Sequence, residues 1–339
     1  MAKQFVEEIR ELGEGETFRS TFFLQAIDRR EAAGWARLKL TLRDRTGEIP
    51  AVIWKSTKTS PAELKAFEYA SGLSAGAFVE VRGKVGTYKD ALQLTVDAIR
   101  EVPPESICRE DFASRSARSP AQMDRELDAA VASVQNPQLR RLLEACFGDP
   151  QLRAAFCECP AAQGQHHAYL GGLAEHTLEV VKLCETVAGI FSQLDRDLLV
   201  TGALLHDLGK TRELSYDVAI DYTDSGRLLG HLVMGEQMVR QRMDSLTDFP
   251  EELALKVSHM ILSHHGDRKL GFGSAVDVRL AEAAALHYAE NLDAQVHKYA
   301  NAAEKTRKAG KRWSDQMRTL DDKSIFLGSP PGEPEEREG

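Results

Sequence analysis

The chain has few features of a membrane protein or of a disulfide-stabilised protein. None of its apolar runs approaches the ~20 residues that are needed to cross a bilayer. Residues 1–16 are charged and contain no apolar segment of the kind found in signal peptides. The 5 cysteines form no Cys-x-x-Cys pair, which is typical of reduced thiols and argues against a zinc ribbon. The sequence therefore predicts a cytoplasmic protein that has no membrane contact.

Positive charge is also scarce. The formal net charge of -9 argues against a protein that coats nucleic acid by bulk electrostatics. The excess of acid is uneven, because residues 1–105 hold as many Lys and Arg as Asp and Glu. A basic stretch surrounds Trp313 and consists of Lys305, Arg307, Lys308, Lys311, Arg312 and Arg318. A phosphate-bearing ligand would therefore be bound locally, and we expect Trp313 to pack the last helix against the body of the protein.

Residues 17–102 alternate in the manner of β-strands separated by turns. The expected strands are Phe18–Ile27, Trp35–Leu42, Glu48–Trp54, Ala77–Val85 and Leu92–Ile99, with a helix over Pro61–Tyr69 and a turn at 88–90. Five strands with a helix between the third and the fourth is the order of an OB-fold, a small barrel that binds single strands. The stretch from Leu42 to Ile49 also resembles the nucleic-acid-binding OB domains.

Aromatic and basic side chains in this region are candidates for binding a single strand by stacking. They are Trp35, Arg37, Lys39, Trp54, Tyr88 and Lys89. An alternative interpretation keeps Trp54 and one of Phe22 or Phe23 in the barrel core and leaves Arg37 and Lys39 on a solvated face. For any single residue we favour this alternative.

The pattern becomes helical after Pro103-Pro104. Helices are expected to begin after Ser119, Asn136 and Asp149, which are good caps, and Asp195 is expected to cap the helix that leads to His206. Further helices are expected over 170–190, 251–264 and 277–305, and residues 216–229 indicate a projecting hairpin.

We therefore expect a multidomain protein in which an all-β OB-fold barrel precedes an all-α domain with a small β-hairpin insertion. The expected segments are the barrel at 1–105, a helical linker region at 106–160, the all-α domain at 161–320 and a disordered tail at 321–339, which is rich in Pro, Gly and Glu.

All 10 histidines lie between residues 166 and 297. In the run Leu204–Lys210, His206 and Asp207 stand side by side within an apolar segment. Such a pair is costly to bury unless a partner or a metal neutralises it, and imidazole with carboxylate suits a divalent transition metal. Lys210 lies four residues after His206, so on a continuous helix it would share that face and could meet a phosphate.

Seven nitrogen and oxygen ligands can be gathered from the helices of this region. They are His176, His206, Asp207, His231, His264, His265 and Asp293. The set exceeds what one metal takes from a protein and suits two metals that share a bridging carboxylate, for which Asp207 is the candidate. Alternatively, His231 could be a helix cap, and one of His264 and His265 could orient the other.

Four residues that precede the first ligand, His176, either line a substrate path or simply begin a helix. They are His166, His167, Gly171 and Gly172. His259, His287 and His297 are expected to be structural or exposed. Of these three, His297 is the best placed to support a ligand, because it follows Asp293 by one turn.

These motifs resemble the HD superfamily of metal-dependent phosphohydrolases, in the version whose extra histidines hold two metals. The resemblance covers about residues 165–300, and the seven ligands match its positions. With an OB-fold in front, and with Gly171–Thr177 leading into the first ligand, the chain is similar to the YhaM family of 3′-to-5′ exoribonucleases. This resemblance implies two divalent ions, with manganese favoured over iron, cobalt, nickel or magnesium, and single-stranded RNA as substrate, with DNA in some members.

The ligand set implies in-line hydrolysis of a phosphodiester that releases nucleoside 5′-monophosphates. His206 and Asp207 would lie at the reaction centre, and Lys210 would stabilise charge on the phosphoryl oxygens. Two alternatives are a phosphohydrolase of small or cyclic nucleotides and a non-catalytic RNA-binding protein. The barrel disfavours the first alternative and the complete ligand set disfavours the second. A homo-oligomer is compatible with the sequence.

Overall fold

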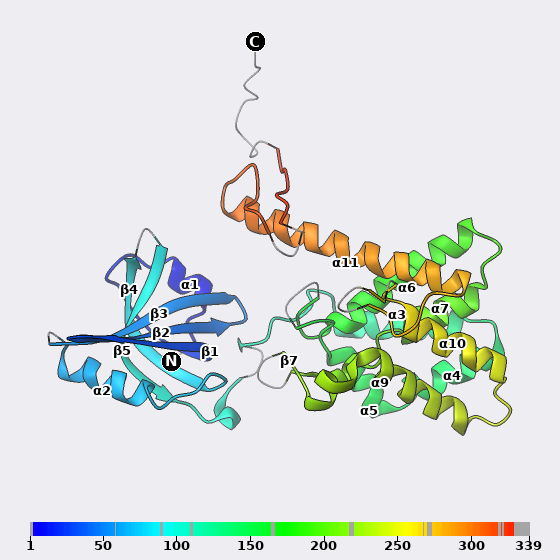
Figure 1. The fold of residues 1–339 in the computed structure, drawn as a ribbon, viewed down its shortest axis with the longest axis horizontal. Helices are drawn as coiled ribbons and strands as arrows, with labels where there is room; N and C mark the ends of the chain where they lie inside the picture. Colours follow the sequence, from blue (N-terminus) through cyan, green and yellow to red (C-terminus); the bar gives the residue numbers. More distant parts are fainter. Residues whose placement is uncertain are drawn as a thin grey trace, which may run out of the picture. The chain divides into compact units, whose positions relative to one another are not determined.

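The chain folds as two compact units, which are divided between Ser114 and Arg115 (Figure 1). The computed structural model describes residues 3–57, 59–88, 91–108, 111–163, 167–216, 220–266, 268–269, 273–317, 320 and 322–328. Lys89, His166 and most of the expected tail lie outside the described residues. Among the described residues, no helix is both long and apolar enough to cross a membrane.

The first unit is a five-stranded barrel with one helix inserted between the third and fourth strands. Its elements are α1 (Val6–Arg10), β1 (Thr17–Ala32), β2 (Trp35–Asp44), β3 (Gly47–Ser56), α2 (Pro61–Ala70), β4 (Phe78–Tyr88) and β5 (Ala91–Glu101), followed by the short 3₁₀ helix η1 (Pro104–Ser106). β1 pairs with both β2 and β4, and β3 pairs with β5 in parallel, which closes the strand order β1-β2-β3-β5-β4 into a barrel. The expected OB-fold is therefore confirmed.

Alternation along the strands fills the inside of this barrel. In β2 every second residue from Ala36 to Leu42 is buried, while the residues between them face outward, as period-two patterning requires. Phe22 is fully buried in the same core, and α2 adds Phe67. Trp54 is instead 40% exposed, so the alternative that placed Trp54 in the barrel core is wrong.

The second unit is a helical body with one short hairpin. Its elements are α3 (Pro120–Ser133), α4 (Pro137–Phe147), α5 (Pro150–Glu158), α6 (Gly172–Ile190), α7 (Arg196–Leu205), α8 (Lys210–Glu213), β6 (Leu214–Ser215), β7 (Asp221–Tyr222), α9 (Asp224–Ser245), α10 (Glu251–Ser263) and α11 (Ala281–Lys308). Helices α3 to α5, which belong to the expected linker region, contribute side chains to the same core as the later helices. The proposed segment boundaries stay a prediction.

Helix α7 lies at the centre of this body. Every residue from Leu198 to Leu205 is buried, and α4, α6, α10 and α11 all pack against the helix. A helix that is apolar on all sides belongs in a core, and Asp195 caps its first turn as expected. The residues that follow α7, beginning with His206, therefore lie at the centre of the unit.

Two local expectations need correction. The His206-Asp207 pair does not lie inside a helix, because α7 ends at Leu205 and residues 206–209 form a turn before α8. The expected hairpin is also shorter than 216–229: β6 and β7 pair over two residues each, and α9 begins at Asp224. Thr223 caps that helix by accepting a hydrogen bond from the backbone N–H of Gly226. Ser225 and Gly226, a pair that favours a turn, therefore lie in the first turn of α9.

Candidate metal centre

Side chains from α6 and from the turn after α7 form a first group of potential ligands. His176 lies in α6, and its Nε2 is 3.3 Å from Nε2 of His206. Oδ2 of Asp207 is 3.5 Å from His176 Nε2 and 3.4 Å from His206 Nε2. The three residues are buried. Gly209 allows this turn to lie directly against the backbone of α9. A Cβ atom on Gly209 would come within 2.1 Å of the His231 carbonyl oxygen.

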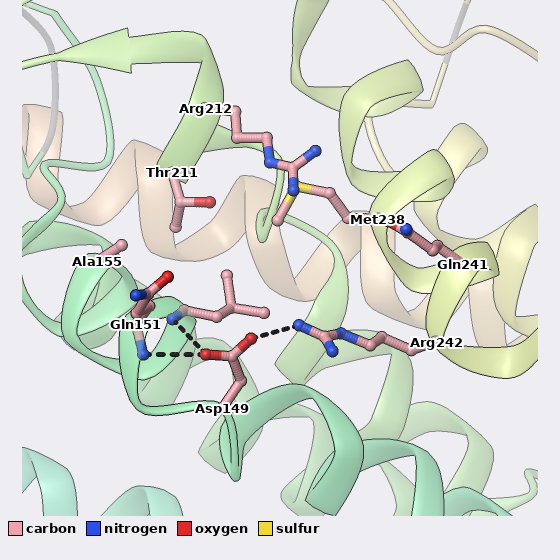
Figure 2. Close-up of a pocket in the computed structure, with 9 residues that line it drawn as sticks. Asp149, Gln151, Ala155, Thr211, Arg212, Met238, Gln241 and Arg242 are labelled. Atoms are coloured by element: carbon pink, nitrogen blue, oxygen red, sulfur yellow. Dashed lines mark hydrogen bonds and ion pairs between the residues drawn. The ribbon is translucent and has the colours of Figure 1, made fainter. Parts of the chain in front are cut away.

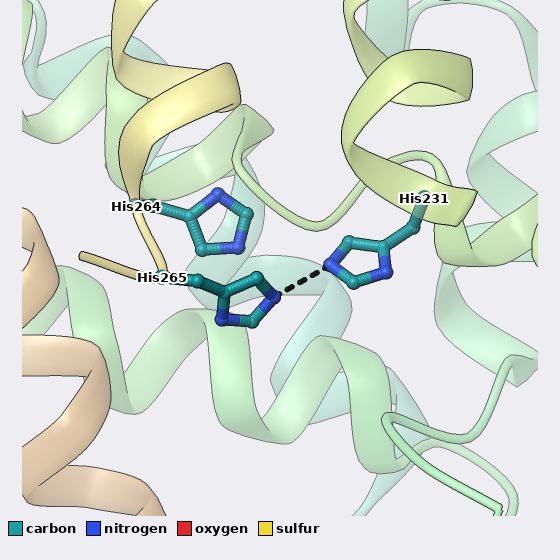
Figure 3. A group of neighbouring side chains, drawn as sticks. All are labelled: His231, His264 and His265. Carbon is teal, nitrogen blue, oxygen red and sulfur yellow. Dashed lines mark hydrogen bonds between the residues drawn. The ribbon is translucent and has the colours of Figure 1, made fainter. Parts of the chain in front are cut away.

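Three histidines from α9 and the end of α10 form a second group (Figure 3). His231 begins the part of α9 that follows a kink at Gly230, where φ is 73°. His264 and His265 directly follow α10. Nε2 of His231 lies 2.9 Å from Nε2 of His265. His231 and His265 are partly exposed while His264 is buried, so this group opens toward solvent on one side.

Asp207 lies between the two groups. Its Oδ2 faces His176 and His206, and its Oδ1 is 3.5 Å from His231 Nε2 and 3.6 Å from His264 Nε2. Each carboxylate oxygen therefore faces a different set of imidazoles. This placement is the one that a bridging carboxylate between two cations requires.

The histidines are held so that they present Nε2 inward. Four of them direct Nδ1 at an oxygen acceptor, so the N–H of the neutral ring is at Nδ1 and the lone pair is at Nε2. The acceptors are Asp293 Oδ2 for His176 (2.6 Å), the Ala203 carbonyl for His206 (2.7 Å), Glu213 Oε1 for His231 (3.0 Å) and the Ile261 carbonyl for His264 (2.8 Å). Converging lone pairs repel one another unless a cation lies among them.

Two buried atoms reinforce this conclusion. Among the described residues, Asp207 Oδ1 and His264 Nε2 have no hydrogen-bond partner. Buried polar atoms without partners are rare, because the loss of their hydrogen bonds to water costs free energy that no bond within the protein offsets. The donor set therefore fits divalent cations of the kind that imidazole and carboxylate bind.

The protonation states of His176, His264 and Asp207 also suit metal binding. Burial lowers the pKa of His176 to about 4 and that of His264 to about 3, so both rings are neutral at pH 7. Burial acts against ionisation of Asp207, but Lys210 and His206 outweigh it and hold the pKa of Asp207 well below its usual range. The pKa of His206 is raised, because the carboxylate of Asp207 outweighs the effect of burial.

Lys210 points at the same carboxylate. Its Nζ donates a hydrogen bond to Asp207 Oδ2 at 2.6 Å, and the residue is 8% exposed. Burial alone would lower the pKa of Lys210, yet the adjacent Asp207 raises it, so the ammonium keeps its charge. The turn at 206–209, not one continuous helix face, brings the two together.

Asp293 stands apart from these groups. It lies in α11 behind His176, where Oδ2 accepts the Nδ1 hydrogen bond, and its neighbours are His167, Glu179 and His297. His167 is 1% exposed, and Gly171 and Gly172 are buried as well. That these residues line a substrate path stays a prediction. A Cβ on Gly172 would come within 2.1 Å of the His167 carbonyl oxygen, which gives that glycine a packing role.

The outer face of the barrel carries an aromatic pair. Trp35 and Trp54 are each 40% exposed, and their ring centroids lie 5.7 Å apart across β2 and β3. The Arg37 guanidinium lies 5.5 Å from the Trp54 ring centroid, and Lys39 is exposed on the same strand. Tyr88, at the end of β4, is also exposed. The face thus combines stacking surfaces with cations.

Comparisons with known proteins agree with both units. The model of the HD domain matches residues 173–295, and that of the OB-fold nucleic acid binding domain matches residues 29–102. The 3'-5' exoribonuclease YhaM of Shouchella clausii is 32% identical over 86% of this chain and 87% of the relative. The chain belongs to the YhaM family. The expected family and the expected enzyme class, a phosphodiester hydrolase, are confirmed.

Other members of the family match to a similar extent. The YhaM protein of Halalkalibacterium halodurans is 30% identical over 92% of this chain and 93% of its own, and that of Bacillus subtilis is 32% identical over 85% and 87%. Among solved structures, a replication protein A heterotrimer bound to ssDNA matches 26% of this chain and 58% of that chain, at 17% identity and a TM-score of 0.20. That similarity is too low to support an argument.

A polar pocket of about 220 Å³ lies elsewhere in the helical unit and does not belong to the metal centre (Figure 2). Asp149 caps α5 through the backbone N–H groups of Gln151 and Leu152 and also pairs with Arg242 of α9. Asp149 and Arg242 thus hold α5 to α9. None of the seven predicted ligands lines this pocket.

The structure adds partners that the sequence analysis missed. Glu213 is buried and holds His231, and Glu179 accepts a hydrogen bond from His297 at 2.8 Å. Their only signal in the sequence is proximity to predicted site residues, since Glu213 follows Lys210 by three residues and Glu179 follows the ligand His176 by three. Trp313 is 56% exposed and stacks against Phe326, so the expectation that it packs the last helix against the body is wrong.

Proposed function

We propose that this chain is a metal-dependent 3′-to-5′ exoribonuclease that hydrolyses single-stranded RNA, with single-stranded DNA as a second substrate, and releases nucleoside 5′-monophosphates. The observation that carries the proposal is Asp207, which directs one carboxylate oxygen at each of two imidazole groups. The relatives that bear the name 3'-5' exoribonuclease and cover most of the chain support the polarity and the RNA substrate. The absence of paired cysteines supports assignment to the reducing cytoplasm.

Two divalent cations would be held by the two groups, with manganese as the first candidate and iron, cobalt, nickel or magnesium as the others. His176, His206 and Asp207 would hold one, and His231, His264, His265 and Asp207 the other, with Asp293 as the seventh predicted ligand. When bound, such cations acidify water and neutralise charge on phosphodiester oxygens.

The side chains of the centre have separate tasks. Asp207 remains anionic because its pKa is held low, and the neutral rings of His176 and His264 keep their Nε2 lone pairs directed inward. Lys210 keeps a positive charge next to Asp207, where it can offset the negative charge that grows on the phosphoryl oxygens. The partly exposed His231 and His265 mark the side from which a strand end can enter.

The barrel would hold the strand. Trp35 and Trp54 offer faces on which bases stack, and Arg37 and Lys39 offer charge for the phosphates. Because both units belong to one chain, a strand held by the barrel is present at a high effective concentration for the metal centre. This arrangement favours long single strands over small nucleotides.

Asp207→Ala tests the shared carboxylate. We expect wild-type protein to bind close to two Mn²⁺ at the two groups and the variant to lose most of both ions. We also expect activity to fall by more than about 100-fold, which exceeds the usual loss when a residue that only supports a metal ligand is replaced. Metal content after dialysis is the measurement, and Asp221→Ala, an exposed aspartate in β7, is the control. If Asp207→Ala keeps both ions of the two imidazole groups and its activity, the shared carboxylate is ruled out.

A further inference from the structure

Two histidines and two carboxylates meet between α6 and α11, outside the two groups described above. His167 precedes α6, Glu179 lies in α6, and Asp293 and His297 lie in α11. One nitrogen or oxygen atom of each lies within 4.8 Å of the others. We name these four residues the α6–α11 cluster. It shares only Asp293 with the ligand set that the sequence predicts.

The distances within the cluster are short. His297 Nε2 lies 2.8 Å from Glu179 Oε2 and 3.8 Å from Asp293 Oδ1. His167 Nε2 lies 3.3 Å from Asp293 Oδ2 and 3.6 Å from Glu179 Oε2. Each imidazole therefore faces both carboxylates, which is the arrangement of donors around a common centre.

Two carboxyl groups in one largely buried place carry an electrostatic cost. The Asp293 side chain is 4% exposed and that of Glu179 is 31% exposed. Buried charges of this kind are stabilised by protons, by cationic partners or by a metal ion.

The outer contacts of His167 point to a metal ion. Tyr169 donates its hydroxyl hydrogen to Glu175 Oε2 at 2.9 Å, so its oxygen is left to accept from His167 Nδ1, which lies 2.8 Å away. A neutral His167 then carries its N–H on Nδ1 and presents the Nε2 lone pair to the two carboxylates. A lone pair that faces carboxylate oxygens is favourable when a cation lies between them. On its other side, His167 is supported by Tyr169 and, through it, by the carboxylate of Glu175, and support by a carboxylate is usual for a histidine that binds a metal.

We propose that the α6–α11 cluster binds a third divalent transition-metal ion, separate from the two of the metal centre. Two imidazoles and two carboxylates form a donor set that suits manganese, iron or zinc. Donor atoms about 2.0–2.2 Å from such an ion lie up to roughly 4 Å apart, so the cluster needs to contract only slightly. The partly exposed Glu179 and His297 provide a path of entry.

The third ion has a structural consequence for the centre. His176 Nδ1 donates to Asp293 Oδ2 at 2.6 Å, so an ion that fixes Asp293 also fixes the ring of His176. The inference concerns metal binding and does not depend on the exoribonuclease proposal.

Counting Mn²⁺ on metal-stripped, full-length protein tests the inference. Equilibrium dialysis followed by elemental analysis of wild type and of the double variant Glu179→Gln/His297→Gln gives the number of ions per chain. We expect the double variant to bind one Mn²⁺ fewer than wild type, and Asp207→Ala to retain that ion. Glu185→Gln, a glutamate of α6 that pairs with Arg196, is the matched control and should keep the wild-type number.

A second variant leaves all four donors in place. Tyr169→Phe removes the acceptor of the His167 Nδ1–H together with the donor to Glu175 Oε2. We expect the affinity for this one ion to fall about 10- to 100-fold while the other ions are unaffected. The inference is overturned if the double variant binds as many Mn²⁺ ions as wild type, or if Tyr169→Phe leaves every affinity unchanged. Either result would make the cluster a hydrogen-bonded network. Both outcomes are independent of activity on RNA.

Discussion

At the scale of single residues, Glu213 performs two tasks with one oxygen. Its Oε1 accepts hydrogen bonds from both the backbone N–H and the Nδ1 of His231, each at 3.0 Å. The bond from the backbone N–H caps the part of α9 that follows the kink at Gly230. The bond from Nδ1 fixes the His231 ring with Nε2 directed inward. Glu213 is therefore a positioning residue for the second group of histidines.

Glu213→Gln should weaken one metal position selectively. The amide is a poorer acceptor than the carboxylate, so we expect affinity at the second group to fall about 10- to 100-fold while the first group keeps its ion. Mn²⁺ titration of metal-stripped protein gives this split, with Glu236→Gln, a glutamate of α9 bonded to Ser258, as control. Equal losses at both groups, or none at all, would contradict the assigned role.

The buried histidines also predict how stability depends on pH. Their folded-state pKa values of about 4 for His176 and about 3 for His264 lie below the 6.5 of an unperturbed histidine. Below pH 6.5 the unfolded chain therefore binds more protons, and each ring lowers the free energy of unfolding by up to about 1.4 kcal/mol per pH unit on acidification. Burial lowers the pKa of His265 too, so it adds in the same direction, whereas the raised pKa of His206 acts oppositely.

We thus expect metal-stripped protein to lose stability steadily between pH 6.5 and pH 4. Urea denaturation at several pH values measures the effect, and His264→Asn should reduce the slope. A free energy of unfolding that stays constant or rises on acidification would show that these rings are not buried in the neutral form.

At the scale of elements, regular alternation made the barrel predictable. The polar and apolar positions of β2 follow directly from the sequence between Trp35 and Leu42, and the observed burial repeats them. Helices with a good cap were located as well, as with α7 after Asp195. The sequence could not show that α7 stops at Leu205, because that end depends on the close approach of Gly209 to α9.

The candidate site was predictable in its residue types and not in its grouping. The adjacent His206 and Asp207 and the concentration of histidines after residue 166 indicated the kind of ligands, and Asp207 was the candidate for the shared carboxylate. The separation of Asp293 from the two imidazole groups arises from its packing beside Glu179 and His167, which are far from it in sequence. Such contacts between α6 and α11 leave no local signal.

The outer face of β2 and β3 carries the prediction for strand binding. Trp35→Ala and Trp54→Ala should each weaken binding of single-stranded RNA by roughly 10- to 100-fold, since one stacked base is worth about 1–3 kcal/mol. Fluorescence anisotropy with a labelled RNA in the presence of chelator measures binding without cleavage. Tyr69→Ala, an exposed aromatic residue on α2, is the matched control, and unchanged affinity in both tryptophan variants would assign the pair a structural role.

At the scale of the whole molecule, an acidic chain combines a neutral barrel with a metal centre in a separate unit. A net charge of -9 argues against bulk electrostatics as the source of affinity for RNA, so we expect local stacking and bound cations to supply it. Activity on RNA should therefore depend on metal far more than on the overall charge of the protein.

The central claim is most directly tested by a time course on single-stranded RNA that carries a 5′ label, with Mn²⁺, with chelator, and with Asp207→Ala in place of wild type. We predict a ladder of products that shortens from the 3′ end in the first case and is absent in the other two. RNA that stays intact with Mn²⁺, or a ladder that persists in the presence of chelator, would contradict a metal-dependent 3′-to-5′ exoribonuclease.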